Sequence, residues 1–265
     1  MTLSVVILAT NEELMLPGAL ASAAFADEVL VVDGGSTDAT ATLAAAGGAC
    51  VVSRPLDDFS SQRNFAMEQA MSDWVLFLDA DERVTPGLAR EVQALLAAGP
   101  PHDAYAIPRA SMAFGRWLEW HPGGGPDAPV RLVRAGAARW VGEVHEALHG
   151  AASTGALTER LVHLTHRTVS EVVGKIDRYS EYEAAEMARR GAPAPAARDL
   201  LRSFRVALRS LLRSGLKREG IEGAVEALLL AFNRTLVMAK VWERANAERI
   251  AAAYARAEQD LRASD

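Results

Sequence analysis

Apolar runs alternate with segments of helical periodicity over residues 1–100. The apolar runs favour buried strands, and they lie at 3–8, 28–33, 49–53 and 74–79. The spacing of apolar residues between and after these runs predicts helices at 12–25, 37–46, 60–71 and 86–97. Strand alternating with helix is typical of an α/β protein, in which helices cover both faces of a mostly parallel sheet.

The pattern changes twice further along the chain. Residues 101–168 hold short, partly alternating segments separated by glycine and proline, with no periodicity from His121 to Pro129. From residue 169 the spacing is helical, with one break at 191–197. We therefore expect three parts, at 1–100, 101–168 and 169–265.

A basic amphipathic helix is predicted at 198–219. It holds seven Lys and Arg residues against two acids, while its leucines and Phe204 fall at helical spacing on another face. Because the whole chain carries a net charge of −6, this local excess of positive charge favours contact with an anionic membrane surface. The alternative is an ordinary solvated helix packed on the domain.

Bulk properties narrow the class of protein. The net charge of −6 argues against nucleic acid as the main partner. The single cysteine, Cys50, leaves no internal disulfide and fits a reducing cytoplasm. The N-terminus lacks the basic region of a signal peptide, and the longest apolar candidate, 224–241, is interrupted by charged residues. We expect a cytoplasmic protein, peripheral on the inner face of the cell membrane.

Two carboxylates, Asp79 and Asp81, follow the fourth predicted strand. Positions i and i+2 of a strand point to the same side, so both side chains are expected to aim at one spot. Two such carboxylates repel each other unless a cation lies between them. Oxygen ligands favour Mg²⁺ or Mn²⁺, which usually also hold substrate phosphates. The pair therefore predicts a metal–phosphate site.

Other polar residues follow the predicted strands at the same edge. Residues 10–13 follow the first strand, 33–38 the second, and 62–64 open the helix before the fourth. In an open α/β sheet, ligands bind outside the carboxyl ends of the strands, and helix N-termini suit phosphates. Helix capping by Thr37 or Asp38 is the structural alternative for part of this set.

Three other kinds of phosphate site can be compared with this pattern. A dinucleotide fold needs a glycine-rich turn after its first strand, but the first glycine of this chain is Gly18. A Walker A loop is absent. A phosphatase with Asp79 as nucleophile remains an alternative, although its Asp-x-Asp motif normally closes the first strand and has Thr or Val where this chain has Arg83.

Several motifs together resemble a known family. They are Val-Val-Ile-Leu-Ala-Thr-Asn-Glu-Glu at 5–13, Val-Val-Asp-Gly-Gly-Ser-Thr-Asp-Ala-Thr at 31–40, Gln-Arg-Asn-Phe-Ala at 62–66 and Phe-Leu-Asp-Ala-Asp-Glu at 77–82. In this order they resemble the family 2 glycosyltransferases of GT-A fold. Segments at 107–109, 115–117, 144–146 and 163–166 add a resemblance to the lipopolysaccharide-core β-glucosyltransferase-like branch.

The resemblance implies roles for each part of the chain. Residues 1–100 would form the nucleotide-sugar-binding half of a GT-A domain, 101–168 its acceptor-side half, and 169–265 a helical region. Asp79 would hold ribose or metal, and Asp81 would ligate an Mg²⁺ or Mn²⁺ ion that bridges the diphosphate. Gly34 stands where relatives often carry Ser or Asn, and we expect little effect. The donor-side residues would be Thr10, Asn11, Glu12, Asp33, Gly35, Ser36, Gln62, Arg63, Asn64, Asp79, Ala80 and Asp81.

The acceptor side carries the predicted catalytic base. Glu146 is our first candidate and Glu143 the second, because both lie where the base of the family falls. His145, between them, would ligate the metal, contact the diphosphate or serve a structural role. Further acceptor-side candidates are Arg109, Trp117 and His166, with Trp120 and His163 as additional aromatic and phosphate-contacting candidates.

The function expected from the sequence is therefore inverting, metal-dependent transfer of a sugar from a nucleoside-diphosphate sugar. A UDP-sugar is the favoured donor, and a lipid-linked or cell-envelope glycan is the expected acceptor. A phosphatase of the Asp-nucleophile type and a non-catalytic nucleotide-sugar-binding protein remain the alternatives.

Overall fold

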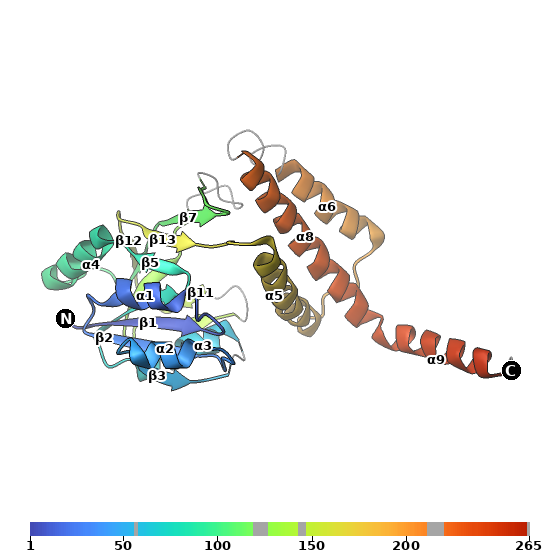
Figure 1. Cartoon of the computed structure of the whole chain (residues 1–265), viewed down its shortest axis with the longest axis horizontal. Helices are drawn as coiled ribbons and strands as arrows, with labels where there is room; N and C mark the ends of the chain where they lie inside the picture. The colour runs from blue at the N-terminus through green and yellow to red at the C-terminus, as the bar shows by residue number, and fades with distance from the viewer. Residues whose placement is uncertain (56–57, 119–126, 143–146, 211–219, 264–265) are drawn as a thin grey trace. The chain divides into compact units, whose positions relative to one another are not determined.

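The computed structural model describes residues 1–55, 58–118, 127–142, 147–210 and 220–263 (Figure 1). The chain forms two compact units, Met1–Arg167 and Thr168–Asp265. The finer division of the first unit near residue 100 stays a prediction.

The first unit is built on a seven-stranded sheet within these described ranges, in the order β12-β6-β9-β4-β1-β2-β3. Strands β1 to β4 are parallel, β9 runs antiparallel to both β4 and β6, and β12 pairs in parallel with β6. The predicted α/β class with a mostly parallel central sheet is confirmed. The strands are β1 (Leu3–Ala9), β2 (Glu28–Asp33), β3 (Cys50–Ser53), β4 (Trp74–Asp79), β6 (Ala104–Ala106), β9 (Val130–Arg134) and β12 (Thr154–Ala156).

Two apolar clusters lie on opposite faces of this sheet. One contains Leu3, Val5 and Ile7 of β1 together with residues of α1 (Leu16–Ala23), α2 (Thr40–Ala46) and α4 (Pro86–Ala98). The other contains Val6 of β1 with Ala66 of α3 (Phe59–Gln69) and Trp140. Because successive side chains of a strand point to opposite faces, the continuous apolar runs of β1 and β4 supply both clusters.

Smaller strands complete the first unit. A four-stranded sheet has the order β5-β13-β7-β8, and β10 pairs with β11 in an antiparallel ribbon. In the four-stranded sheet, β13 runs antiparallel to β5 and parallel to β7. The strands are β5 (Glu82–Val84), β7 (Arg109–Ala113), β8 (Arg116–Trp117), β10 (Arg139–Val141), β11 (Ala147–His149) and β13 (Leu161–Leu164).

Two helices begin later than their sequence pattern suggests. The helix expected at 12–25 begins at Leu16, and the one expected at 37–46 begins at Thr40. For the second of these helices, side chains of the first loop take the backbone N–H groups ahead of it: Asn11 Oδ1 accepts from Thr37 and Glu13 Oε2 accepts from Ala39. Local side-chain bonds of this kind compete with helix formation.

The second unit is helical. Its helices within the described ranges are α5 (Val169–Arg189), α6 (Ala197–Ser210), α8 (Gly220–Ala245) and α9 (Ala247–Ala263). Helix α8 packs against both α5 and α6, and Lys240 of α8 donates to Asp177 of α5 at 2.7 Å. The predicted break at 191–197 corresponds to the linker between α5 and α6. Among the residues that the structure describes, no helix is long and apolar enough to cross a bilayer.

Candidate active site

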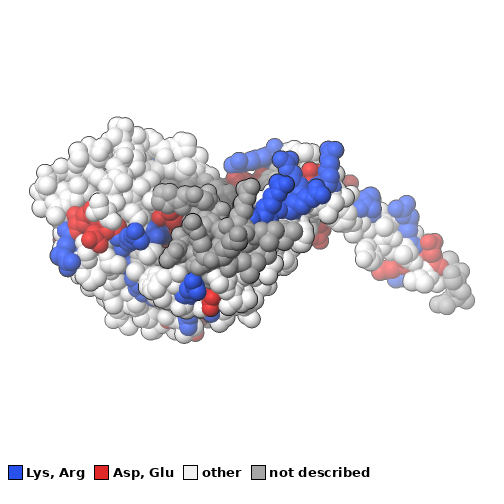
Figure 2. All heavy atoms as spheres, turned by 90° about the horizontal axis from the view of Figure 1, so that it is seen from above, with Lys and Arg blue, Asp and Glu red and all other residues white. Residues whose placement is uncertain are grey.

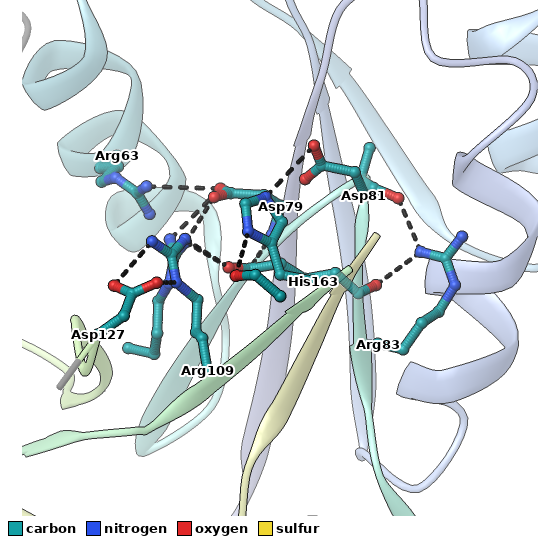
Figure 3. Close-up of polar contacts among 11 residues, drawn as sticks. Arg63, Asp79, Asp81, Arg83, Arg109, Asp127 and His163 are labelled. Atoms are coloured by element: carbon teal, nitrogen blue, oxygen red, sulfur yellow. Dashed lines mark hydrogen bonds and ion pairs between the residues drawn. The ribbon is translucent and has the colours of Figure 1, made fainter. Parts of the chain in front are cut away.

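The two acids of the Asp-x-Asp motif are held by different partners. Asp79 is the last residue of β4, residues 80–81 form a turn, and β5 starts at Glu82. The chain leaves the extended conformation between the two acids, so the alternation of a strand does not set the relative directions of their side chains. In Figure 3, Asp79 points toward Arg63, whereas Asp81 points toward His163. Asp79 also contacts Arg131.

Arg131 of β9 joins Asp79 to a second, fully buried acid. Its Nη2 lies 2.5 Å from Asp79 Oδ2 and 2.8 Å from Glu82 Oε1. Arg63 Nη2 lies 3.5 Å from the other oxygen of Asp79. Burial by itself would raise the pKa of Asp79, but the charges of Arg131 and Arg63 outweigh it and hold that pKa well below its ordinary value. Asp79 is ionised in the folded protein at neutral pH.

Sequence reasoning did not select Arg131 or Glu82. The available signal was an arginine inside the apolar strand Val-Arg-Leu-Val-Arg at 130–134, since a charge buried in a strand requires a buried partner. The identity of that partner could not be read from the sequence, because Glu82 lies 49 positions away.

The small sheet brings His163 beside Asp81. The β13–β5 register pairs His163 with Glu82, and the N–H of Leu164 donates to the carbonyl of Asp81 at 2.8 Å. His163 Nε2 then lies 3.5 Å from Asp81 Oδ2, while its Nδ1 lies 3.3 Å from Ser111 Oγ. The sequence had placed His163 only among possible phosphate or acceptor contacts.

The turn between the acids is fixed by Arg83. Its guanidinium donates to the carbonyls of Ala80 and Glu82, at 2.8 Å and 2.6 Å, and to that of Met15 at 2.8 Å. The position where the phosphatase motif has Thr or Val is thus occupied by a residue that holds the turn and ties it to the first loop.

The loops after β1 and β2 are interlocked. Asn11 adopts a left-handed backbone (φ 56°), which asparagine tolerates better than most residues. Its N–H donates to Ser36 Oγ at 2.9 Å, and the N–H of Glu12 donates to Thr40 Oγ1 at 2.8 Å. Asp33, 6% exposed, accepts from the N–H groups of Gly35 and Ser36. The donor-side candidates of these two loops therefore form one connected structure.

Gly34 has no room for a side chain in this arrangement. A Cβ built there would lie 2.0 Å from Thr10 Oγ1 and 3.4 Å from Gln62 Nε2. A side chain at this position would require the Thr10 hydroxyl to move, so the expectation that glycine has little effect stays a prediction.

The three candidates at the start of α3 have different partners. Gln62 is 3% exposed and donates to the carbonyl of Arg54 at 3.3 Å. Arg63 stacks over the rings of Phe77 and Trp140 while it faces Asp79. Asn64 pairs with the backbone of Trp140 through both amide atoms, at 2.8 Å and 2.9 Å. Helix α3 is thus linked to Asp79 through Arg63.

The acceptor-side candidates are dispersed. Arg109 is half-buried and engages Asp127 through two nitrogens, and Glu82 at 3.1 Å. Trp117 is 50% exposed on β8. His166 has a left-handed backbone (φ 47°), and its ring lies 6.3 Å from that of Phe114. Four further candidates, Trp120, Glu143, His145 and Glu146, lie outside the described residues.

The described part of the chain holds no group of three or more His, Cys, Asp or Glu residues that could bind a metal ion. It does place one carboxylate and one imidazole together, in Asp81 and His163. Mg²⁺ and Mn²⁺ bound with a phosphorylated ligand commonly take only one or two protein side chains. The donor set fits a cation completed by phosphate oxygens.

Comparison with known proteins gives consistent results. Residues 4–135 match the model of the family described as glycosyl transferase family 2. The chain is 29% identical over 251 residues to the lipopolysaccharide core biosynthesis glycosyltransferase LpsC of Rhizobium meliloti, covering 91% of this chain and 92% of LpsC. It is 26% identical over 263 residues to an uncharacterized glycosyltransferase of Rickettsia typhi, covering 91% and 87%.

Solved structures show the same fold. The structure of S. aureus TarS 1-349 in complex with UDP-GlcNAc has a TM-score of 0.51 and 16% sequence identity, covering 95% of this chain and 92% of TarS 1-349. The family match spans β1 to β9, which includes the loops after β1 and β2 and the Asp-x-Asp turn. The chain is a glycosyltransferase of GT-A fold, belongs to glycosyltransferase family 2, and resembles the lipopolysaccharide-core branch of that family.

Proposed function

We propose that this protein transfers a sugar from a UDP-sugar to a lipid-linked or cell-envelope glycan acceptor, with inversion at the anomeric carbon. The observation that carries the proposal is the gathering of Asp33, Asp79 and Asp81 at the carboxyl ends of β2 and β4, beside the interlocked loop after β1. Ligands of open α/β sheets bind at this edge. UDP is our first candidate because the related fold of TarS was solved with UDP-GlcNAc.

Asp81 and His163 are the residues that would hold a divalent cation against the diphosphate of the donor. When bound, such a cation neutralises the charge that develops on the leaving diphosphate. This changes the metal-ligand set expected from sequence, since Asp79 is engaged by two arginines and His163 enters as a candidate. His145 stays a prediction.

The base that removes the proton of the acceptor hydroxyl stays with Glu146, or Glu143 as second candidate. A carboxylate there would act on the hydroxyl as it attacks the anomeric carbon, opposite the leaving diphosphate. An envelope glycan is the proposed acceptor class, in line with the lipopolysaccharide core biosynthesis role of LpsC.

The first test is donor binding and transfer by matched variants of the metal-ligand candidate. In Asp81→Asn the side chain keeps its size and loses its charge, so we expect transfer to fall by about 100-fold or more, while folding is unchanged. Sugar transfer from UDP-, GDP-, ADP- and TDP-sugars with Mn²⁺, measured alongside thermal unfolding, checks this. Full activity of the variant would refute the role of Asp81.

Outcomes of the same assay separate the alternatives. Donor binding without transfer or slow donor hydrolysis would favour a nucleotide-sugar-binding protein. Loss of transfer in Glu146→Gln with unchanged donor binding would support the base, and an active variant would move that role elsewhere.

We also propose that the protein is peripheral on an anionic membrane surface through α6. Four arginines form a stripe along α6, at positions 198, 202, 205 and 209, and all are exposed. Leu201, Phe204 and Val206 are 63%, 57% and 41% exposed on the same helix. Figure 2 shows Lys and Arg side chains gathered on one face of the C-terminal helical unit. Positive charge beside exposed apolar side chains suits binding in the lipid headgroup region.

A further inference from the structure

Arg131 is a buried cation that none of the proposed roles employs. It is 4% exposed and contacts two acids with one nitrogen, Asp79 at 2.5 Å and Glu82 at 2.8 Å. Burying charges costs desolvation free energy that pairing only partly offsets, so apolar residues of similar volume often serve stability as well or better. The position of Arg131 next to the donor edge calls for a role in addition to stability.

Glu82 gives Arg131 a fixed anchor. Its side chain is fully buried and also accepts from the N–H of Asp79 at 3.0 Å and from Arg109 Nη1 at 3.1 Å. The carboxylate therefore holds both the backbone of Asp79 and the guanidinium that contacts the Asp79 side chain. Arg131 and Glu82 together fix Asp79 from its main chain and its side chain.

The resulting environment of Asp79 is unfavourable for a metal ligand. Each of its oxygens faces a guanidinium, Oδ2 that of Arg131 and Oδ1 that of Arg63. A divalent cation bound to either oxygen would lie close to two positive charges and would be repelled. The side chain is nevertheless 34% exposed, so the remaining lone pairs of its oxygens can accept hydrogen bonds from neutral hydroxyl groups.

We propose that Arg131, anchored by Glu82, is a positioning residue: it fixes the Asp79 carboxylate as an acceptor for hydroxyl groups of the nucleotide and keeps it out of the coordination of the divalent cation, which is left to Asp81. This inference rests on the proposed function for the identity of the donor. It resolves the choice between ribose and metal that the sequence left open for Asp79.

The test is UDP binding by the full chain, measured by calorimetry in EDTA and in Mn²⁺. Arg131→Met should weaken UDP binding by about 10-fold in both media, because one badly placed acceptor costs about that factor with or without metal. Asp81→Asn should lose only the gain in affinity that Mn²⁺ gives. Arg131→Lys keeps the charge but lacks the second nitrogen, which in Arg131 lies 3.3 Å from Asp79 Oδ1. The Lys variant should therefore recover part of the affinity, and it guards against a variant that fails to fold.

A double variant separates positioning from stability. Arg131→Met leaves the buried Glu82 carboxylate with one fewer positive partner and should lower the unfolding temperature. Combining Arg131→Met with Glu82→Gln removes the uncompensated charge, so the unfolding temperature should return most of the way to the wild-type value. UDP affinity should remain weak in the double variant. Recovery of UDP affinity together with the unfolding temperature would overturn the proposal, and so would a loss in Arg131→Met confined to the Mn²⁺ arm.

Arg134→Met is the matched control on the same strand. Arg134 also pairs with an acid, Asp103 at 3.2 Å, and stacks on Trp74, away from the acid pair. We expect it to lower stability without changing UDP affinity, and an equal loss of affinity in this variant would overturn the specific role of Arg131. Wild-type UDP binding reports on the proposed donor, whereas differences among variants report on Arg131, so the two can fail separately.

Discussion

At the scale of single residues, the loops after β1 and β2 depend on close approach to each other. Gly34 is the clearest case, because Thr10 and Gln62 occupy the space that a side chain would need. Its carbonyl-side neighbour Gly35 has φ 93°, and the N–H groups of Gly35 and Ser36 converge on Asp33. The conformation of the loop after β2 therefore depends both on the glycines at 34 and 35 and on the Asp33 carboxylate that accepts from its N–H groups.

We predict that Gly34→Ala weakens donor binding by about 10-fold, because the added methyl displaces Thr10 from the loop after β1. The measurement is UDP affinity by calorimetry beside thermal unfolding. Gly48→Ala is a poor comparison because its φ is positive, so Gly174→Ala in α5, where open space surrounds the position, is the control. Unchanged affinity in Gly34→Ala would mean that Thr10 rotates away freely.

At the scale of elements, α3 supports strand β10 through Asn64. The side chain pairs with both backbone groups of Trp140, as a neighbouring strand would, and so fixes β10 to the helix. The ring of Trp140 packs edge-on against Phe77 of β4 at 5.5 Å. In the sequence, β10 ends two positions before Glu143, the second candidate for the base, so Asn64 anchors the strand that precedes both candidates.

Asn64→Ala should lower the free energy of unfolding by about 2–3 kcal/mol, since two buried backbone groups lose their partner. Urea denaturation measures the change, and Glu68→Ala, exposed on the same helix, should stay within about 0.5 kcal/mol of the wild type. Reduced UDP affinity at unchanged stability would instead support the nucleotide-bordering role that the family resemblance implies for Asn64.

At the scale of the whole molecule, charge is unevenly distributed. The chain has a net charge of −6, yet α6 carries four arginines and one acid. That acid, Asp199, accepts from the N–H of Ala196 at the start of the helix and lies off the arginine stripe. An acidic protein with one basic, partly apolar helix is suited to binding an anionic surface in one orientation.

Vesicle sedimentation tests this orientation. The full chain should bind vesicles containing about 30% anionic lipid and not purely zwitterionic ones, with binding that weakens as salt rises. Replacing Arg202 and Arg205 by Ala should weaken binding by about 30-fold, because each basic residue near the surface contributes about 1 kcal/mol and two are removed. Arg249→Ala with Arg256→Ala on α9 is the matched control. Equal loss in both pairs would indicate attraction by net charge alone.

The family resemblance and the fold class could be read from the sequence because they depend on local patterns. Apolar runs of strand length and helices of period 3.6 are written in consecutive residues, and the motifs at 31–40 and 77–82 lie at strand ends whatever the rest of the chain does. The positions of Asn11, Asp33 and Asp79 at one edge of the sheet follow from that order.

Only the tertiary structure shows which side chains contact Asp79 and Asp81. Arg131 and His163 reach Asp79 and Asp81 from strands that are distant in the sequence, through antiparallel pairings that local periodicity does not encode. The turn at 80–81 also interrupts the strand alternation on which the predicted directions of the two carboxylates depended. The sequence alone determined that two acids follow β4 at the carboxyl edge of the sheet. The fold decided which basic side chain each acid faces, because pairing between remote strands sets those neighbours.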